Sequence, residues 1–396
     1  MSRKLLLDFD AVSVSTLNLF NIIKRGIGIK NDGQLWSWGY NLDGQKGINS
    51  IVNKSTPIAI LGTIKTFCSI DSGIRHSIGL NNNGKVWCWG DNEFGQLGIN
   101  STGSTSTPVA ILGITKTFCK IDNGGSIHSL GIDNHGKVWG WGANTYGELG
   151  INSTALKSTP VAIAGTLKTF CSITVGWEHS LGIDNRGKVW GWGWNYTGQL
   201  GVNSITSKLI PTAILGSLKT FCSISGGDSF SLGLDHYGYI WSWGFNGNGQ
   251  LGTNNTTFYS TPVAIAGTLK TFCSISCGNS HSLGLDNHGN VWSWGYNLYG
   301  KLGINSTINK STPVAILGTL KTFCSISGGF HYSSGLDNHG NVWSWGINGS
   351  GDLGNNTIVC EKTPVALYST YTNTGTSNYK LLIVDVEKIL LDDIEL

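Results

Sequence analysis

The tetrapeptide Trp-Xaa-Trp-Gly recurs seven times in this chain of 396 residues. The copies stand at residues 36–39, 87–90, 139–142, 190–193, 241–244, 292–295 and 343–346. Successive copies are 51 or 52 residues apart, and fourteen of the sixteen tryptophans belong to them. The seven prolines keep the same period: Pro57, Pro108, Pro160, Pro211, Pro262, Pro313 and Pro364. A fixed period of this length indicates a repeat architecture, in which each unit buries its apolar face against the next.

Each repeat unit predicts four short strands. One unit opens with a Thr-Pro-Val-Ala-Ile run at residues 312–316, which suits an outer strand because proline is confined to sheet edges. Residues 323–327, 332–336 and 341–346 predict three further strands. The Asp-Asn-His-Gly turn at residues 337–340 suits a hairpin, since Asn and Gly tolerate positive φ. Four strands per unit and seven units predict an all-β fold, the seven-bladed β-propeller.

The chain ends predict how the ring closes. Residues 17–20 align with the Phe-Cys-Ser-Ile strand of the other units, and residues 363–367 form an outer strand with no unit after it. We therefore expect N- and C-terminal strands to share the first blade, with residues 363–367 as its outer strand. The predicted domains are an N-terminal extension at 1–12, the propeller at 13–367, and a linker and tail at 368–396. The apolar part of the tail predicts either a strand or an amphipathic helix.

The composition limits the class of protein. Charged residues make up 12% of the chain, and the net charge of +3 is too small to predict nucleic-acid binding by itself. No apolar run has the length of a transmembrane helix, and the first residues are too acidic for a signal peptide. We expect a cytoplasmic or nuclear protein with no membrane partner. The bias toward Lys, Asn and Ile also suits a viral protein, and hence a place in a virion.

Two further residue types follow the repeat. Six cysteines share one repeat position, and we expect small buried thiols there: Cys68, Cys119, Cys171, Cys222, Cys273 and Cys324. Four histidines share another position: His76, His128, His179 and His281. One histidine per blade cannot form a metal site, because ligands must converge within a few ångströms, so we expect each to bond a neighbouring loop. Without a nucleophile–base pair or a phosphate-cradling motif, the sequence predicts no enzyme, no cofactor and no small-molecule substrate.

Strand direction alternates, so the loops fall on two faces of the disc. We call one the lysine face; it carries the turn after each outer strand and the Asp-Asn-Xaa-Gly turn. A ring of lysines there is a candidate surface for weak contact with nucleic-acid phosphates. Its members are Lys65, Lys116, Lys168, Lys219, Lys270 and Lys321. Ten basic residues against six aspartates give this face a balance of about +4. The alternative is a solvated face whose aspartates cap turns.

We call the other surface the aromatic face. It carries the Gly-Gly turn and the loop after Trp-Xaa-Trp-Gly, where the units differ most. Seven acids there outnumber three basic residues, a balance of about −4. Variable aromatic tips on a regular scaffold are typical of binding surfaces. The candidate partner-binding residues are Tyr40, Arg75, Phe94, Tyr146, Trp177, Glu178, Trp194, Tyr196, Phe245, Tyr296, Tyr299 and Phe330. The alternative is repeat drift, with the aromatic side chains packed between blades.

The repeat also resembles a known family. Gly-x-x-His-Ser-Leu-Gly-Leu, followed by Asp-Asn-x-Gly-x-Val-Trp-x-Trp-Gly-x-Asn-x-x-Gly-Gln-Leu-Gly, is similar to the repeat of the regulator of chromosome condensation family, most clearly at residues 176–201 and 278–303. The resemblance implies a seven-bladed propeller. It also implies one of three roles: nucleotide exchange on a Ran-type small GTPase, binding to chromatin or DNA, or scaffolding. Exchange activity in that family is associated with an inserted wedge, for which the constant spacing here leaves no room.

The sequence thus predicts a non-enzymatic interaction or structural protein. Its expected partners are another protein or a second copy of the chain, bound through the propeller faces. Opposite charges on the two faces favour self-assembly, associated with non-specific DNA contact or a nucleoprotein particle. The alternative function is guanine-nucleotide exchange on a Ran-type small GTPase.

Overall fold

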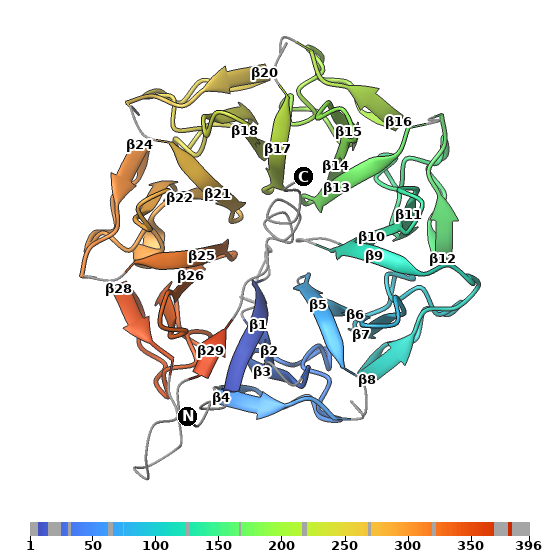
Figure 1. Ribbon diagram of the computed structural model, residues 1–396, viewed down its shortest axis with the longest axis horizontal. Coiled ribbons are helices and arrows are strands. Elements are labelled where there is room, and N and C mark those ends of the chain that lie inside the picture. Colours follow the sequence, from blue (N-terminus) through green and yellow to red (C-terminus); the bar gives the residue numbers. More distant parts are fainter. Residues whose placement is uncertain are drawn as a thin grey trace, which may run out of the picture.

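The computed structural model arranges seven small sheets in a ring around a central axis (Figure 1). It describes residues 7–14, 25–30, 33–61, 66–73, 75–123, 127–165, 168–215, 220–267, 271–318, 322–367 and 379–381. Each sheet is one blade, and successive blades follow the chain around the ring. The predicted all-β fold, a seven-bladed propeller with four strands per blade, is confirmed.

Apart from β29, which lies beside β1 in the first sheet, each blade uses its strands in chain order, from the centre outward. The innermost strands are β1 (Leu7–Val14), β5 (Phe67–Ser72), β9 (Phe118–Asp122), β13 (Phe170–Val175), β17 (Phe221–Gly226), β21 (Phe272–Cys277) and β25 (Phe323–Gly328). The second strands are β2 (Arg25–Lys30), β6 (His76–Asn81), β10 (His128–Asp133), β14 (His179–Asp184), β18 (Phe230–Asp235), β22 (His281–Asp286) and β26 (Tyr332–Asp337).

The third strands carry the Trp-Xaa-Trp-Gly motif. They are β3 (Leu35–Gly39), β7 (Val86–Gly90), β11 (Val138–Gly142), β15 (Val189–Gly193), β19 (Ile240–Gly244), β23 (Val291–Gly295) and β27 (Val342–Gly346). The outer strands are β4 (Lys54–Ala59), β8 (Thr105–Ala110), β12 (Lys157–Ala162), β16 (Lys208–Ala213), β20 (Tyr259–Ala264), β24 (Lys310–Ala315) and β28 (Glu361–Ala366). The described residues also form a short 3-10 helix, η1 (Leu298–Gly300), and a last strand, β29 (Tyr379–Leu381).

The ring closes differently from the prediction. Each proline-containing strand pairs with the Trp-Xaa-Trp-Gly strand that precedes it, so β28 is the outer strand of the seventh blade. The prediction that residues 363–367 complete the first blade is therefore wrong. N- and C-terminal strands still share the first sheet, as predicted, because β29 pairs in parallel with β1. The strand predicted at residues 17–20 lies outside the described residues. Strand β1 spans the predicted limit between residues 12 and 13. The predicted domain limits stay predictions.

The two tryptophans of each motif have different roles. The first is half-buried in the blades that the structure describes, whereas the second is at most 3% exposed. The buried indole also bonds the preceding blade: Trp192 Nε1 donates to the Glu148 carbonyl and Trp243 Nε1 to the Gln199 carbonyl, both at 2.8 Å. In these blades the motif therefore joins adjacent blades through both apolar contact and a buried hydrogen bond.

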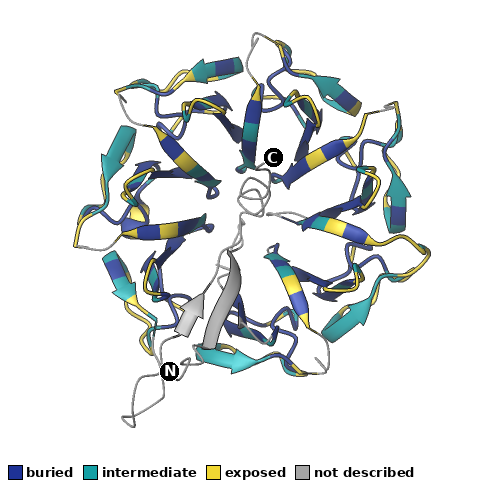
Figure 2. Cartoon of the chain, in the orientation of Figure 1, coloured by how far each residue is buried: buried dark blue, intermediate teal, exposed yellow. Residues whose placement is uncertain are grey.

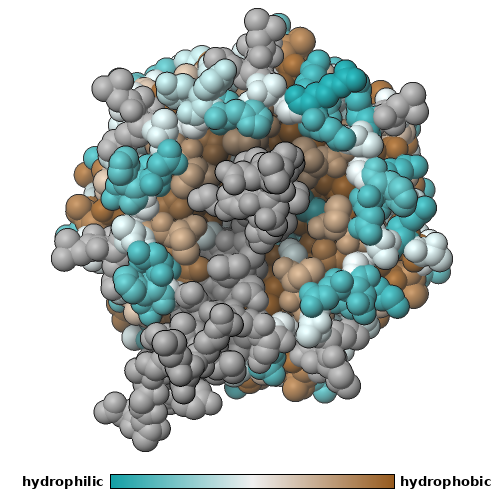
Figure 3. Space-filling view, in the orientation of Figure 1, coloured by the Kyte–Doolittle hydropathy of each residue, from teal (hydrophilic) through white to brown (hydrophobic). Residues whose placement is uncertain are grey.

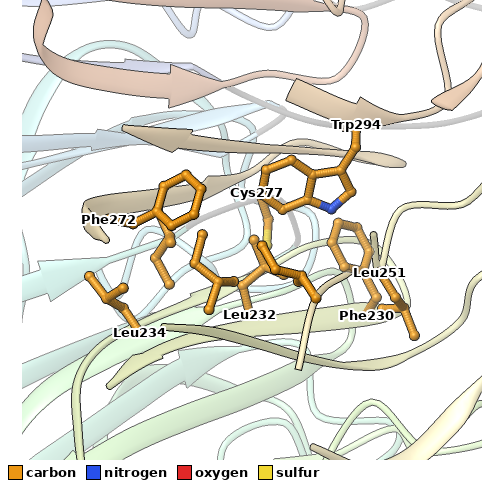
Figure 4. Close-up of a cluster of buried hydrophobic side chains, with 10 residues drawn as sticks. Phe230, Leu232, Leu234, Leu251, Phe272, Cys277 and Trp294 are labelled. Atoms are coloured by element: carbon orange, nitrogen blue, oxygen red, sulfur yellow. The ribbon is translucent and has the colours of Figure 1, made fainter. Parts of the chain in front are cut away.

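Hydrophobic clusters fill the gaps between neighbouring blades. In one of them, Phe230, Leu232 and Leu234 of β18 pack against Phe272 of β21 and Trp294 of β23 (Figure 4). Equivalent clusters recur around the ring. Because each blade covers its apolar face only with the next blade, the repeat units depend on one another for stability.

A ring of hydrogen bonds ties the innermost strands together. Asp71 Oδ2 accepts from the Asn123 backbone N–H at 2.6 Å, and Asp122 Oδ1 accepts from the Val175 N–H at 2.9 Å. In the following blades the acceptors of the equivalent backbone N–H groups are the hydroxyl oxygens of Thr174, Ser225 and Ser276. These bonds run from one blade to the next and so fix the spacing of the inner strands around the axis.

The repeated cysteines lie at a bulge at the start of each innermost strand. In the second blade the pairing shifts between Phe67 and Ser69, which leaves Cys68 unpaired with its Sγ near the Leu80 carbonyl. Five of the six are exposed and Cys222 is half-buried, so the prediction of buried thiols is wrong. The bulge is the reason, because an unpaired residue turns its side chain away from the packed faces. Figure 2 shows exposed segments on several of the innermost strands.

Candidate interaction surfaces

The loops after Trp-Xaa-Trp-Gly share one fold, which holds their variable side chains on the aromatic face. In the fourth blade, the Asn195 amide donates to the Ser204 and Thr206 carbonyls, and its Oδ1 accepts the Leu200 N–H. The corresponding asparagines make the same bonds in other blades. Gly198, at φ 82°, completes the turn in a conformation that favours glycine. The frame is therefore rigid, while the residues it presents are free to vary.

Three aromatic side chains of this face meet across a blade boundary. Tyr146 comes from the β11–β12 loop, and Trp194 and Tyr196 come from the β15–β16 loop. The ring centroids are 6.2 Å apart for Tyr146 and Trp194, 6.2 Å for Tyr146 and Tyr196, and 5.7 Å for Trp194 and Tyr196. Tyr196 is 60% exposed, while Tyr146 and Trp194 are half-buried. We call this trio the aromatic cluster.

Three carboxyl groups lie beside the aromatic cluster, and we call them the acidic cluster: Glu148, Glu178 and Asp228. Glu148 is buried, and its Oε2 accepts the Tyr146 N–H at 2.9 Å. Burial raises the pKa of Glu148 to about 7, with a further contribution from the charge of Glu178. Burial also raises the pKa of Glu178. Burial and the Glu178 charge raise the pKa of Asp228 to about 6. Among the described residues, the charged neighbours acting on these groups are carboxylates.

A second aromatic group forms around Lys301, between the sixth and seventh blades. The Lys301 Nζ donates to the Phe330 carbonyl at 3.1 Å and lies 4.5 Å from the centroid of the Tyr296 ring. His331 packs edge-on against both Phe330 and Tyr299, with centroid distances of 4.0 and 5.9 Å. Burial lowers the pKa of the Lys301 ammonium to about 7. This part of the aromatic face therefore already contains a cation against an aromatic ring.

Lys301 also changes the local backbone. In the second blade, Gln96 occupies the equivalent position, and its Oε1 accepts the Phe94 N–H at 2.9 Å. A lysine ammonium cannot accept that bond. The loop of the sixth blade instead forms η1, with Tyr299 at φ 69°. A single substitution at this repeat position thus changes how the loop presents its aromatic tip.

The other predicted contact residues are spread around the aromatic face. Arg75 and Phe245 are exposed, while Phe94 and Trp177 are half-buried. The Trp177 side chain hydrogen-bonds the Glu178 carboxylate, which places it beside the acidic cluster. Two predicted residues present little surface, because Tyr40 is 7% and Phe330 only 1% exposed. The role of the twelve residues as partner contacts stays a prediction.

On the lysine face, the structure describes Lys116 and Lys168, and both are exposed. The other four ring members, Lys65, Lys219, Lys270 and Lys321, lie outside the described residues. Lys168 and Lys188 each place Nζ 5.7 Å from the centroid of the Trp190 ring. The aspartates of this face cap turns: Asp184 accepts the Lys188 N–H and the Trp190 indole N–H. Figure 3 shows hydrophilic residues gathered in separate patches around the disc, with apolar residues between them.

The repeated histidines bond from blade to blade. His179 Nε2 lies 3.0 Å from Ser231 Oγ, whose proton goes to the Gln199 carbonyl at 2.8 Å. The hydroxyl can only accept, so Nε2 must carry the imidazole proton. Burial lowers the pKa of His128 and His179 to about 3, which keeps both rings neutral. The partner is a strand serine of the next blade rather than the predicted loop, but the role is structural as predicted.

The described residues include neither a metal-binding group nor a helix able to span a membrane. No group of three or more His, Cys, Asp and Glu residues is placed to hold a metal ion. No described helix has the length and apolar character needed to cross a membrane.

Sequence reasoning counted Glu148, Asp228 and Lys301 among the charges of the aromatic face but did not name them as site residues. The available signal was position within the repeat. Glu148 and Lys301 stand where Gln96, Gln199 and Gln250 stand in other blades. Asp352 of the seventh blade is a third buried charged residue at this position. A charged residue where other blades have a buried amide marks a blade that departs from the pattern.

The chain is thus a propeller of Trp-Xaa-Trp-Gly repeats whose variation gathers in the loops of one face. It belongs to the regulator of chromosome condensation (RCC1) family. The RCC1-like domain of that family matches residues 26–270, and RCC1 repeats match residues 272–301 and 288–336. The family resemblance drawn from the motif is therefore confirmed.

Curated relatives include proteins of different overall size. The chain is 29% identical to the ultraviolet-B receptor UVR8 of Arabidopsis thaliana over 288 residues, which are 72% of this chain and 65% of the receptor. It is 28% identical over 346 residues to the human E3 ubiquitin-protein ligase HERC2, covering 84% of this chain and 7% of the ligase. The chain therefore spans just under two thirds of one relative and a small part of the other.

Solved structures share the fold. Human WBSCR16 superimposes with a TM-score of 0.77 at 20% identity, covering 85% of this chain and 95% of that one. Prp20p of Saccharomyces cerevisiae superimposes with a TM-score of 0.76 at 22% identity, covering 85% of this chain and 86% of that one. At these identities the likeness concerns the fold alone.

Proposed function

We propose that this propeller is a non-enzymatic interaction module that binds a protein partner through its aromatic face. The observation that carries the proposal is the aromatic cluster, in which three rings from two blades meet on rigid loops, with Tyr196 exposed and the other two half-buried. Exposed aromatic groups on a rigid scaffold are the usual anchors of protein interfaces. Relatives support this role: one structure holds Kap60 bound to yeast RCC1 (Prp20), and Prp20p was described with its binding properties to Gsp1p and histones.

Site-specific photocrosslinking tests which face is used. The crosslinking residue replaces Phe245, which is exposed on the aromatic face. The matched control replaces Tyr237, an exposed aromatic residue in the Asp-His-Tyr-Gly turn of the lysine face. In cells that express the chain, we expect protein adducts from position 245 and few from position 237. Equal yields at the two positions, or adducts from position 237 alone, would contradict the proposal.

Self-association, with or without DNA, is a second candidate. The supporting observation is that Lys116 and Lys168 are exposed on one face while the acidic cluster lies on the other, so copies could stack head to tail. Particle size and binding to random duplex DNA, followed together across a salt series, test this. Stacking predicts that the particle size increases at low salt without DNA. A DNA contact on the lysine face predicts that the affinity for DNA falls as the salt concentration rises. If neither appears, both forms are rejected. A role in a virion stays a prediction.

Nucleotide exchange is the remaining alternative. The structural similarity to Prp20p, which was described with its binding properties to Gsp1p, supports this alternative. The constant repeat of 51 or 52 residues, without an insertion, argues against it. Nucleotide release from a Ran-type GTPase, measured with catalytic amounts of this chain, decides between the two. Acceleration would replace our proposal with an exchange function.

A further inference from the structure

The aromatic cluster and the acidic cluster form one continuous site between the third, fourth and fifth blades. Glu148 accepts the backbone N–H of Tyr146 at 2.9 Å, so a buried carboxyl contacts the backbone of the aromatic cluster. The Glu178 carbonyl accepts the Trp194 N–H at 2.8 Å, which places Glu178 next to the aromatic cluster. Asp228 lies in the β17–β18 loop of the fifth blade, where the neighbouring Gly227 carbonyl accepts the Trp177 N–H at 3.2 Å. The site thus combines π faces with several negative charges.

The sixth blade contains an internal example of how such a site is filled. There the Lys301 ammonium lies 4.5 Å from the Tyr296 ring, beneath a loop built on the same frame. The third blade carries Glu148 at that repeat position. The loop of the third blade therefore has a carboxyl group where the loop of the sixth blade has an ammonium group. Among the described residues, the charges acting on this acidic cluster are carboxylates.

We propose that the site formed by Tyr146, Trp194, Tyr196 and the acidic cluster binds the cationic side chain of a lysine or arginine from a basic segment of a protein partner. This inference rests on the proposed function and specifies the partner's chemistry. The ammonium or guanidinium lies against the exposed aromatic rings, and Glu178, with Glu148 beneath, supplies the opposing charge. Methylated lysine shares this chemistry and is one arm of the test.

Charge complementarity selects this occupant over others. An acidic segment would meet three carboxyl groups and be repelled. An apolar segment would bury Glu178 without a counter-ion, which is costly. A cation instead relieves the repulsion between Glu178 and Asp228, which adds to the effect of burial on the pKa of Asp228. It also gains contact with the negative faces of the rings.

The test uses purified full-length chain and short fluorescent peptides at low ionic strength. One peptide carries four lysines separated by glycine and serine. A second carries trimethyl-lysine, and a third carries norleucine, which keeps the apolar stem and removes the charge. Binding is followed by fluorescence anisotropy. We expect the lysine and trimethyl-lysine peptides to bind and the norleucine peptide to bind at least roughly tenfold more weakly.

Two variants locate the site and one controls for net charge. Glu148→Gln should weaken binding of the lysine peptide by roughly tenfold, and Tyr196→Ala by roughly fivefold. Glu148→Gln should fold normally, because Gln96, Gln199 and Gln250 occupy that position in other blades. The control, Glu93→Gln, removes the same charge from an exposed position in the second blade. It should change the affinity by less than roughly twofold, since the charge is solvated.

Each other outcome overturns the inference. Equal losses from Glu93→Gln and Glu148→Gln would mean that only the overall charge of the face matters. Equal binding of the norleucine peptide would mean an apolar surface. If no peptide binds, the cation site is rejected, while adducts from position 245 would still support the proposed function. Adducts confined to position 237, together with specific peptide binding, would reject the proposed function instead.

Discussion

Replacing His179 by phenylalanine tests whether the repeated histidines are buried as neutral rings. Phe230 occupies the same position in the fifth blade, so the fold accepts phenylalanine there. Ser282 shows that the next blade's serine keeps its bond to the Gln250 carbonyl, at 2.7 Å, without a histidine beside it. At neutral pH we therefore expect His179→Phe to cost only about 1 kcal/mol, the value of the lost Nε2–Ser231 hydrogen bond.

The effect of pH is larger and has a definite sign. Burial lowers the pKa of His179 to about 3, from 6.5 in the unfolded chain. The unfolded state therefore binds the extra proton between these two values, and this contribution to stability is lost as pH falls below about 6.5. At pH 5 the unfolded pKa is about 1.5 units above the pH, which corresponds to about 2 kcal/mol lost by the wild-type chain. The variant has no such loss.

Urea unfolding followed by tryptophan fluorescence, at pH 7 and at pH 5, measures the effect. The difference between wild type and variant is the useful quantity, because Glu148 and Asp228 have raised pKa values and act in the opposite direction in both proteins. Relative to wild type, the variant should gain about 2 kcal/mol between pH 7 and pH 5. A difference that stays constant within about 0.5 kcal/mol would refute the assignment of a buried neutral imidazole.

Three further substitutions probe the frame. Burial lowers the pKa of Lys301 to about 7, so the wild type gains stability as pH rises toward 10. In urea titrations, the unfolding free energy of Lys301→Gln relative to the wild type should therefore fall by about 3 kcal/mol between pH 7 and pH 10. Trp243→Ala should cost about 3 to 5 kcal/mol, more than Trp241→Ala, because only the first is fully buried; the reverse order would contradict the packing. Gly252 and Gly267 have similar φ, 70° and 74°, but a Cβ meets Trp294 at 2.8 Å only at Gly252. Thermal melting should therefore show Gly252→Ala to be the more destabilising, and equal losses would exclude the contact.

Much of the fold could be predicted from the repeat. The period of the tryptophans and prolines determined the number of blades, because each unit needs neighbours to cover its apolar face. The Asp-Asn-Xaa-Gly turns, the alternation of faces and the structural histidines also followed from local pattern. The assignment of the outer strand did not. A periodic sequence does not mark where a unit begins, and Thr363 pairs with the strand before it only because β28 folds back on β27.

The candidate site, too, could be predicted only in part from the sequence. The sequence alone identified the variable aromatic tips, since loop residues that differ between identical frames stand out. It did not determine that Tyr146 meets Trp194 and Tyr196 while Tyr40 is buried. Nor did it determine that Glu148 is buried and accepts the Tyr146 N–H. Contacts between blades and burial depend on side chains about 50 residues apart, and no local pattern encodes the packing of one blade against the next.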